Sequence, residues 1–465
     1  MICYHARWVV PVTSPPIPHG VVAVDDGAIV YVGAASGAPL ANDYDLGEAV
    51  LLPGLVNAHT HLELTAMRGF LEGLPFDDWI DTLRRARVAV LDDAMLLDSA
   101  RLGVIEGLEH GVTTFADTSA SGVPARAMRE CGVRGIMYQE TFGPDPLACD
   151  AAMAELDGRV RALTADPAKL VSIGVSPHAP YTVSDALYRA VATYASTNRL
   201  PIAMHIAEGA DEYALVTSGT GMFAERLGRR GIRTPARARS PITLLAELGA
   251  LPPGALLIHA VHADTEDIRT IAQHHACVAH CPVSNAKFGH GMAPLTHFLA
   301  AGIPVGLGSD SVASNNRMDM LDEARIALLL QNARYESPLE VSAQTALELV
   351  TIRGASALGL ERTIGSLEVG KAADLVAFRL DSSRATPAEN PVAALIFTLG
   401  GSRAFLVTVA GRHLVENGEA VINPGGLRGR VAGCGRLLAE WRSAADSTAD
   451  TTAGTTPGTL DLAAR

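Results

Sequence analysis

The chain has 465 residues, of which 48% are apolar and 5% are aromatic, so it can bury a large core. Its formal net charge is −13, with 37 Lys and Arg against 50 Asp and Glu. We expect no nucleic-acid partner, because neutralising phosphates requires basic patches. The six cysteines form no CxxC pair, which indicates reduced thiols and a cytoplasmic protein. We also expect no membrane span, because no window of about 18 apolar residues is free of charge.

Short strand-like runs fill the first part of the chain, residues 1–50. Gly and Pro separate these valine-rich runs, and Asp26-Gly27 between two of them is a hairpin signal. Short strand-like runs separated by turn residues return at 363–425. We therefore predict one composite β-sandwich domain built from residues 1–50 plus 363–425. Residues 426–465 are predicted to form a C-terminal helix followed by a Ser/Thr/Ala-rich tail that we expect to be disordered.

The middle of the chain, 51–362, alternates short β-branched runs with longer helical patterns. One run ends at His61, and the other seven are GVTTFAD, RGIMYQETF, VSIGVSPHA, PIAMHIAE, GALLIHAVH, ACVAHCPVS and IPVGLGSD. Eight β/α units of this total length are typical of a (β/α)8 TIM barrel, an α/β fold.

The first run ends in NAHTHLELT (57–65). Side chains on a strand alternate between its two faces, so His59 and His61 point the same way, toward the mouth of the predicted barrel. The pair alone is weak evidence for a metal, because surface or hydrogen-bonded histidines give the same pattern.

Polar residues at the other strand ends strengthen the metal interpretation. They are His178, His205 with Glu208, His259 with His262, and Asp310. In a barrel, the C-terminal ends of the strands converge on one mouth. So many imidazoles and carboxylates facing one cavity would stay unsatisfied without a cation. We therefore predict a metal site.

Imidazole and carboxylate ligands without a thiolate suit Zn²⁺, with Fe²⁺ as the alternative. We predict His59, His61, His205 and Asp310 as ligands, with an open position for water. The cation would lower the pKa of that water to about 7. Asp310 and His259 would hold the resulting hydroxide and take its proton, while Glu208 would carry a proton to the substrate.

These motifs are similar to those of the amidohydrolase superfamily, in the branch of the chlorotriazine hydrolases, guanine deaminase and nucleoside deaminases. The resemblance covers the chain to about residue 425 and is carried by PGLVNAHTHLE, SPHAPY, HIAEG, HCPVSNAKFGHG, LGSDSVASNN and IGSLEVGKAADLV. It implies a (β/α)8 barrel, a composite β-sandwich and a single Zn²⁺ or Fe²⁺ on the four ligands above. It also implies that Glu208 protonates a ring nitrogen, that His259 orients the hydroxide and that His178 contacts the substrate.

Relatives with two metal ions carry a carboxylated lysine, or sometimes a glutamate, at the end of barrel strand four. We assign that strand to GIMYQETF, which has no lysine, and therefore expect one ion. Glu140 in this run leaves a second ion open as a minor alternative.

The complete set of His205, Glu208, His259 and Asp310 favours hydrolytic deamination, in which metal-bound hydroxide adds to an amino-bearing ring carbon and ammonia leaves. HTHLE resembles most the aminodeoxyfutalosine deaminases of menaquinone biosynthesis. We therefore predict a 6-aminopurine nucleoside derivative as the substrate, specifically 6-amino-6-deoxyfutalosine.

Adenosine, 5′-methylthioadenosine and S-adenosylhomocysteine are alternative substrates. The strand assigned as the fourth ends in Gln139 and Glu140, without the arginines that clamp a homocysteine carboxylate, which counts against the last of these. A guanine, pterin or triazine hydrolase is another alternative. A non-catalytic scaffold is a remote one, which the complete ligand set argues against.

Further candidates for substrate contact lie near the predicted mouth. By alternation Glu63 points the same way as His61, where it could grip a ribose or an amino group, or merely bond the first βα loop. Residues 67–83 are expected to form a lid over the pocket. Glu72 and Trp79 in this lid are candidates for substrate contact, and the alternative is that they only pack against neighbouring side chains. Gln139 is the last candidate. We expect Asn285 to brace a loop near the mouth, and the protein to be a homodimer.

Overall fold

Strands from both ends of the chain form one nine-stranded sheet in the computed structural model, which describes residues 1–165, 168–422 and 424–453. Its order is β17-β16-β15-β14-β5-β1-β2-β3, with β4 paired to β1. The N-terminal strands are β1 (Ile2–Val9), β2 (Ile17–Asp25), β3 (Ala28–Ala34), β4 (Asn42–Asp45) and β5 (Ala49–Pro53). The C-terminal strands are β14 (Leu375–Arg379), β15 (Leu406–Val409), β16 (Arg412–Glu416) and β17 (Glu419–Ala420).

The two ends of the chain meet where β5 pairs antiparallel with β14. The predicted hairpin is confirmed: β2 and β3 pair antiparallel around Asp26 and Gly27, whose φ angles of 47° and 76° suit a tight hairpin turn. By its pairing this unit is a single sheet, so the two-layered sandwich remains a prediction.

The eight predicted strands of the middle section are all confirmed. They form two four-stranded parallel sheets, β6-β7-β8-β9 and β10-β11-β12-β13. Parallel bridges between Thr60 and Asp310 and between Val175 and Ile202 connect the edges of the two sheets. The strands are β6 (Leu55–Thr60), β7 (Val112–Ser119), β8 (Arg134–Thr141), β9 (Val171–Pro177), β10 (Ala203–Ile206), β11 (Leu256–His259), β12 (Cys277–His280) and β13 (Val305–Leu307).

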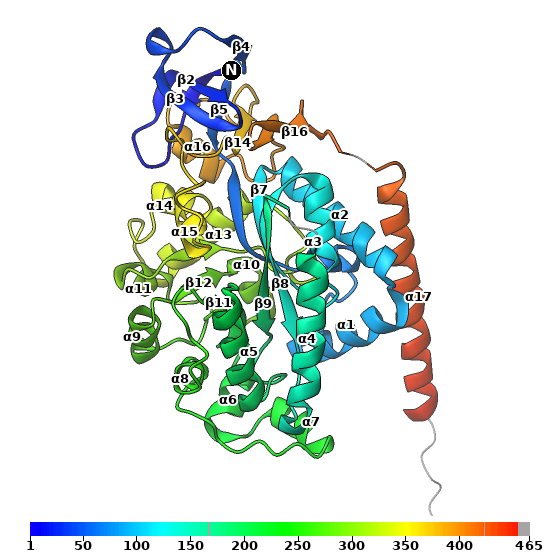
Figure 1. The fold of residues 1–465 in the computed structure, drawn as a ribbon. Helices are drawn as coiled ribbons and strands as arrows, with labels where there is room; N and C mark the ends of the chain where they lie inside the picture. The colour runs from blue at the N-terminus through cyan, green and yellow to red at the C-terminus, as the bar shows by residue number, and fades with distance from the viewer. Residues whose placement is uncertain (166–167, 423, 454–465) are drawn as a thin grey trace, which may run out of the picture.

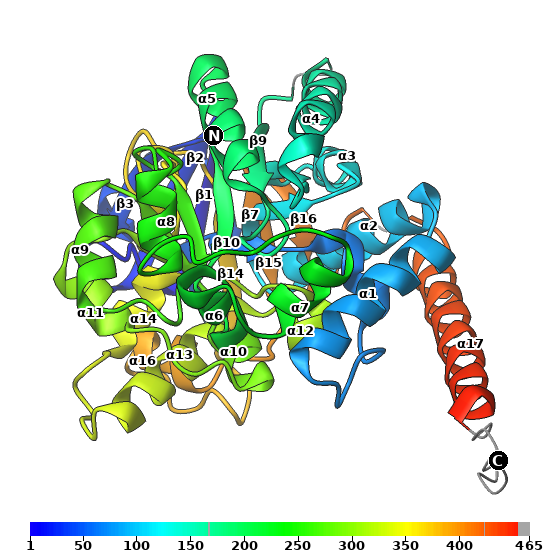
Figure 2. The same cartoon turned by 90° about the horizontal axis from the view of Figure 1, so that it is seen from below.

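Helices surround these parallel strands, and the nine-stranded sheet lies at one end of the molecule (Figures 1 and 2). The first helices are α1 (Phe76–Val90), α2 (Asp93–Glu109), α3 (Val123–Cys131), α4 (Cys149–Thr164), α5 (Asp185–Asn198), α6 (Ala210–Ser218), α7 (Met222–Arg229), α8 (Pro241–Glu247) and α9 (Thr265–Gln273). The others are α10 (Pro282–Phe288), α11 (Leu295–Ala300), α12 (Val312–Asn315), α13 (Met320–Arg334), α14 (Ala343–Leu349), α15 (Ile352–Ala357), α16 (Pro391–Phe397) and α17 (Leu427–Ala453). Three 3₁₀ turns are η1 (Ala35–Gly37), η2 (Leu62–Met67) and η3 (Pro146–Ala148).

Gly54 divides what the sequence presents as one apolar run into β5 and β6. A Cβ at this position would lie 2.2 Å from Oγ1 of Thr113, so only glycine lets the chain pass so close to β7. The amide of Gly54 donates to the carbonyl oxygen of Asp374 at 2.8 Å. The chain crosses here from the nine-stranded sheet into the parallel strands. His59 in β6 and His61 directly after β6 therefore lie among the parallel strands.

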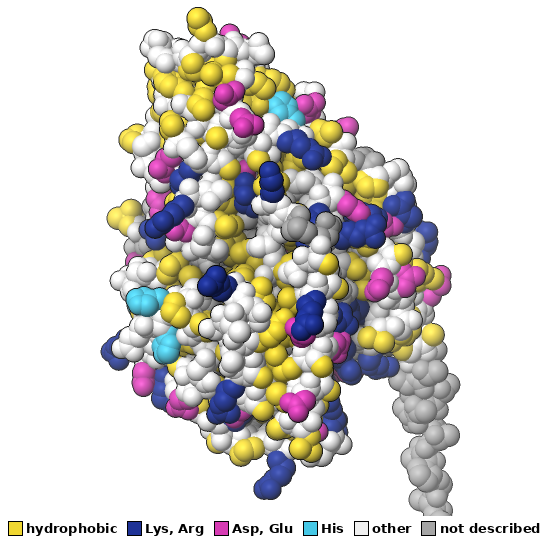
Figure 3. Space-filling model, in the orientation of Figure 1, with side chains coloured by type: hydrophobic (Ala, Val, Ile, Leu, Met, Phe, Trp, Pro, Cys, Tyr) yellow, Lys and Arg dark blue, Asp and Glu magenta, His cyan; other side chains and the backbone are white. Residues whose placement is uncertain are grey.

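The last helix, α17, stands along the outside of the molecule (Figure 1). It contacts α1 and α2: the guanidinium of Arg85 lies 5.6 Å from the centre of the Trp441 ring, and Arg442 donates to the backbone oxygen of Phe70 at 2.5 Å. The predicted disordered tail from 454 onward lies outside the described residues. None of the described helices is both long enough and apolar enough to cross a bilayer. On the face shown in Figure 3, Lys and Arg side chains are interspersed with Asp and Glu.

A buried ion pair joins the two parts of the fold. Arg134, the first residue of β8, donates to both carboxylate oxygens of Asp374 at 2.8 and 3.1 Å, and their side chains are only 11% and 2% exposed. We expect Arg134→Met to lower the free energy of unfolding by about 3–5 kcal/mol, because it leaves a buried carboxylate unpaired. Urea unfolding measures the change.

A matched control is Arg161→Met on α4. Arg161 pairs with Asp157 at 2.7 Å, but its side chain is 78% exposed. Exposed pairs of this kind contribute about 1 kcal/mol or less. Equal losses in the two variants would contradict a joining role for the buried pair.

Candidate active site

The predicted metal ligands lie at the carboxyl ends of three different parallel strands. His59 lies in β6, His61 directly follows it, His205 lies in β10, and Asp310 follows β13. The amide of Asp310 donates to the backbone oxygen of His59 at 3.0 Å, which fixes β13 beside β6. Residues 251 positions apart in sequence are thereby brought into one cluster.

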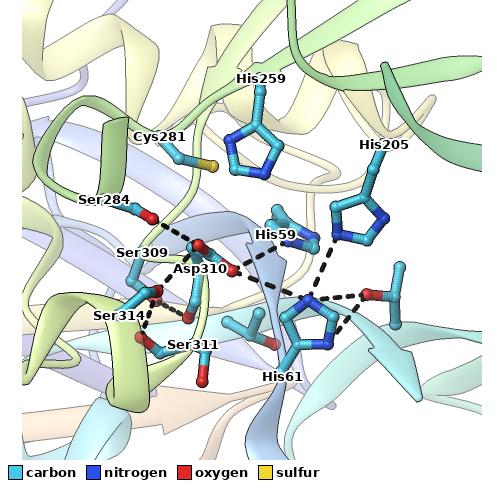
Figure 4. A network of polar contacts seen from close by, with 12 residues as sticks. His59, His61, His205, His259, Cys281, Ser284, Ser309, Asp310, Ser311 and Ser314 are labelled. Carbon is cyan, nitrogen blue, oxygen red and sulfur yellow. Dashed lines mark hydrogen bonds and ion pairs between the residues drawn. The ribbon is translucent and has the colours of Figure 1, made fainter. Parts of the chain in front are cut away.

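The donor atoms of this cluster face one another (Figure 4). Nε2 of His61 lies 3.3 Å from Nε2 of His205, and Oδ1 of Asp310 lies 3.4 Å from Nε2 of His59 and 3.7 Å from Nε2 of His61. The ligand atoms of His59, His61 and His205 all lie within 4.8 Å of one another, as do those of His59, His259 and Asp310. The structure thus brings together all four predicted ligands.

The chemistry of these donors fits a divalent cation. His59 is buried, and neither of its ring nitrogens has a hydrogen-bond partner among the described residues. Burial lowers the pKa of His59 to about 4 and that of His205 well below its usual value, so both imidazoles are neutral, as metal ligation requires. Unpartnered neutral nitrogens at this depth are costly unless a ligand satisfies them.

Asp310 supplies the negative charge. Burial acts to raise its pKa, but the contact with His59 and the other nearby imidazoles outweigh burial and lower it. The hydroxyls of Ser284 and Ser314 donate to Oδ2 at 2.5 and 2.8 Å, which leaves Oδ1 directed at the histidines. A φ of 56° at Asp310 is rare for a residue with a side chain, and such conformations cluster at active sites.

Glu208 and His259 lie side by side, next to the predicted metal ligands. Oε1 of Glu208 is 3.5 Å from Nε2 of His259, and both side chains are buried. Nδ1 of His259 donates to Oδ1 of Asn285 at 2.9 Å, so Nε2 carries the lone pair that faces the site. Burial lowers the pKa of His259, whereas burial and the Asp310 carboxylate raise that of Glu208 well above its usual value. Asn285, predicted to brace a loop, also orients His259.

A cavity of about 280 Å³ opens beside this cluster. His178, Glu63 and Trp79, three of the predicted substrate contacts, line it. Nδ1 of His178 shares a hydrogen bond with Oγ1 of Thr182 at 2.8 Å, which fixes the orientation of the imidazole ring. Apolar side chains form much of the remaining wall, namely Leu64, Phe76, Ile80, Leu83, Phe142 and Phe288.

Two predicted substrate contacts do not line this cavity. Glu72 lies near the surface, where it accepts from Lys287 at 2.8 Å and from Asn316 at 2.9 Å. Gln139 is fully buried and donates to backbone oxygens, including that of Ser119 at 3.2 Å. Both side chains hold loops in place around the site.

Glu63 lines the cavity with its carboxylate already engaged. Oε1 accepts from Arg87 at 2.9 Å, and Oε2 accepts from Ser119 at 2.7 Å and also from Ser121. Arg87 belongs to α1, so this network ties α1 to the end of β6. The sequence pattern did not indicate Arg87, because its role depends on how α1 packs.

The assignment of the fourth barrel strand to GIMYQETF was wrong. In chain order β8, which carries this run, is the third parallel strand, and β9, which leads to His178, is the fourth. Glu140 at the end of β8 nevertheless lines the cavity, and its ligand atom lies within 4.8 Å of those of His178 and His205. Burial raises the pKa of Glu140 to about 7.

Comparison with known proteins agrees with this geometry. Residues 50–416 match the amidohydrolase family. A 5-methylthioadenosine/S-adenosylhomocysteine deaminase of Moorella thermoacetica is 33% identical over 420 residues, which cover 88% of this chain and 93% of that protein. The crystal structure of an adenosine deaminase from Xanthomonas campestris with bound zinc superposes with a TM-score of 0.83 at 29% identity, covering 95% and 98% of the two chains.

A third similar structure is the Helicobacter pylori aminofutalosine deaminase in complex with methylthio-coformycin. Its TM-score is 0.79 at 21% identity, covering 89% of this chain and 100% of that one, and it therefore supports the fold alone.

The chain belongs to the amidohydrolase family. It is a hydrolase that acts on carbon–nitrogen bonds, of the deaminase kind. The predicted family membership and enzyme class are thereby confirmed.

Removing bound metal should destabilise the protein, because the buried imidazoles of the cluster would lose their partner. With Zn²⁺ present at about 100 times its dissociation constant, the holo-protein should be about 2.7 kcal/mol more stable than the chelator-treated protein. Calorimetric melting before chelation, after chelation and after restoring Zn²⁺ measures this difference. Identical melting curves in all three states would contradict metal binding at the cluster.

Proposed function

We propose that this protein is a metal-dependent hydrolytic deaminase of a 6-aminopurine nucleoside derivative. The observation that carries the proposal is the position of Glu208, a buried carboxyl group of raised pKa lying 3.5 Å from His259, in a cavity lined also by the metal-ligand cluster. A carboxylic acid whose pKa is raised by burial holds its proton more strongly than a free one and can donate it to a ring nitrogen.

Each side chain of the site has a distinct task in this proposal. Glu208 protonates the purine ring, which makes the amino-bearing carbon more electrophilic. Neutral His259, held by Asn285, presents a lone pair that accepts a proton from the attacking water. Asp310, fixed by two serine hydroxyls, orients the same water. The proton later passes to the departing nitrogen, and ammonia leaves.

We propose a single Zn²⁺, with Fe²⁺ as the alternative, held by His59, His61, His205 and Asp310. When bound, the cation lowers the pKa of water to about 7 and so supplies a nucleophile at neutral pH. Zinc in the Xanthomonas campestris structure supports the choice of metal. Glu140 does not complete a second set of metal ligands. The group that it forms with His178 and His205 shares His205 with the ligands proposed for Zn²⁺.

The substrate within this class is a proposal with two candidates. The HTHLE motif supports 6-amino-6-deoxyfutalosine, which would assign the protein to menaquinone biosynthesis. The name of the Moorella thermoacetica relative supports 5′-methylthioadenosine and S-adenosylhomocysteine.

A panel of substrates tests the proposal. Ammonia release by the purified protein is measured with aminodeoxyfutalosine, adenosine, 5′-methylthioadenosine, S-adenosylhomocysteine, guanine and a chlorotriazine. We expect turnover of at least one 6-aminopurine nucleoside, with kcat/KM of about 10⁴ M⁻¹s⁻¹ or more for the best. Turnover of guanine or the triazine alone would overturn the proposed class.

We also propose that the eight parallel strands form one closed (β/α)8 barrel within residues 51–362. The bridges at both edges of the two sheets support closure. The nine-stranded sheet would be the composite β-sandwich of residues 1–50 plus 363–425. A shared core that includes Tyr4, Val22, Leu51, Leu375 and Leu406 supports a single unit made from both ends of the chain.

A further inference from the structure

A second cavity, of about 320 Å³, lies behind Glu208. Four side chains line both cavities and form the partition between them: Phe76, Tyr181, Glu208 and Phe288. A larger share of the wall is polar in the second cavity than in the first, and Asp211, Glu212, His262 and His290 contribute to it. Ala210, Asp211 and Gly289 on its wall are exposed, so it reaches the protein surface.

His290 projects into this cavity beside the partition. Its side chain is only 9% exposed, and Nε2 lies 3.7 Å from Oε1 of Glu208 without a hydrogen-bond partner among the described residues. The rings of Phe76 and His290 pack almost perpendicular to each other, with 4.7 Å between their centres. Nε2 of His262, which lines the same cavity, is also buried without a partner. Two unsatisfied imidazole nitrogens on a polar cavity wall indicate that small polar molecules occupy it.

Glu208 is held at the partition by its own backbone. The carboxylate of Glu212 accepts from the amides of Ala207 and Glu208 at 2.7 and 2.9 Å, and Ala207 has a φ of 51°. This turn directly after β10 keeps the Glu208 side chain where it lines both cavities. Its Oε1 lies 3.5 Å from Nε2 of His259, which lines the main cavity, and 3.7 Å from Nε2 of His290, which lines the second.

We propose that the second cavity is the route by which water enters and ammonia leaves while the nucleoside fills the main cavity. This inference rests on the proposed function. Hydrolytic deamination breaks the bond between the ring carbon and the amino nitrogen and forms a bond from that carbon to a water oxygen, so each turnover takes up one water and releases one ammonia. A pocket encloses about 70–90% of its ligand, so a bound nucleoside with a long 5′ group obstructs the main mouth for both small molecules.

His290 is the positioning residue of this route. Its Nε2 is placed to bond water or ammonia next to Glu208, on the side away from the purine. The apolar partition residues Phe76 and Phe288 keep the nucleoside out, and the polar groups beyond them suit small hydrogen-bonding molecules.

The test fills the second cavity without altering the main one. Ala210→Phe places a bulky ring at its exposed edge, and Ser218→Phe, at the far exposed end of the same helix, is the matched control. The kcat of each is measured with S-adenosylhomocysteine, which closes the main mouth, and with adenosine, which leaves it more open. Melting temperature and metal content show that each variant is folded and loaded.

We expect Ala210→Phe to lower kcat about tenfold with S-adenosylhomocysteine but less than about twofold with adenosine, with KM unchanged in both cases. Ser218→Phe should match the wild type with both substrates. Equal effects of Ala210→Phe on the two substrates, or no effect on either, would overturn the proposed route. If the wild type released no ammonia from any 6-aminopurine nucleoside, the proposed function itself would fail, and the route with it.

A second variant keeps the inference testable if Ala210→Phe does not fold. His290→Ala should lower kcat with S-adenosylhomocysteine, and added imidazole should restore part of it by entering the space that opens to the second cavity. A loss of kcat that imidazole does not restore, together with normal metal content, would overturn the role of His290.

Discussion

Replacing Glu208 with glutamine should lower kcat by about 10²–10⁴-fold, the usual contribution of a positioned acid or base. The glutamine keeps the size of the side chain but cannot give up a proton to the purine ring. The metal content should stay at the wild-type level, because Glu208 is not among the predicted ligands. Steady-state ammonia release and elemental analysis of the same preparation measure both quantities.

The matched control is Glu225→Gln on α7, where the side chain is 71% exposed. It removes the same charge at the surface and should leave turnover within about twofold of the wild type. Unchanged turnover in Glu208→Gln would refute the proton-transfer role. Loss of metal in that variant would instead indicate that Glu208 is a ligand.

Asp310→Asn should abolish ammonia release and also reduce the amount of metal that the protein retains. The change removes the negative charge of the cluster and leaves neutral imidazoles as the main donors. It also puts amide hydrogens where Oδ1 or Oδ2 now lies, and Oδ2 accepts from Ser284 and Ser314. We expect turnover to fall by at least about 10³-fold. Metal retention is measured after dialysis against a weak chelator.

Asp381→Asn serves as the control for this change, because Asp381 pairs with Arg379 far from the cluster and is 46% exposed. That variant should retain its metal and its turnover. If Asp310→Asn kept a full complement of metal and normal turnover, Asp310 would be neither a ligand nor a group that orients water.

The sequence predicted that the four proposed metal ligands would cluster, because their placement depends on local rules. Side chains alternate along a strand, and parallel strands in one layer end at the same edge. His59, His61, His205 and Asp310 follow from these two rules once the eight strands have been identified. The boundary at Gly54 was not predicted, because an unbroken apolar run does not show where a strand passes from one sheet to the next.

The substrate contacts were harder to predict, because they depend on loops and on helix packing. Glu72 and Gln139 lie in segments close to the site in sequence, yet neither lines the cavity. Arg87 and His290 reach the site from a helix and a loop whose placement no short pattern reveals. The wrong assignment of the fourth strand had a different cause: GIMYQETF ends in polar residues, as a strand at the site should, but it is the third parallel strand in chain order.

The contact of α17 with α1 has a consequence for variation at the end of the chain. Trp441 and Arg442 support α1 and the segment before it, and the inner face of α1 carries Trp79 over the cavity. A premature stop after residue 426 would spare every side chain that we propose to bind metal or to move a proton. We expect the shortened enzyme to keep its metal while KM rises severalfold. Sequence changes in α17, far from the reacting groups, would in this way alter which nucleosides bind, while the reaction stays the same.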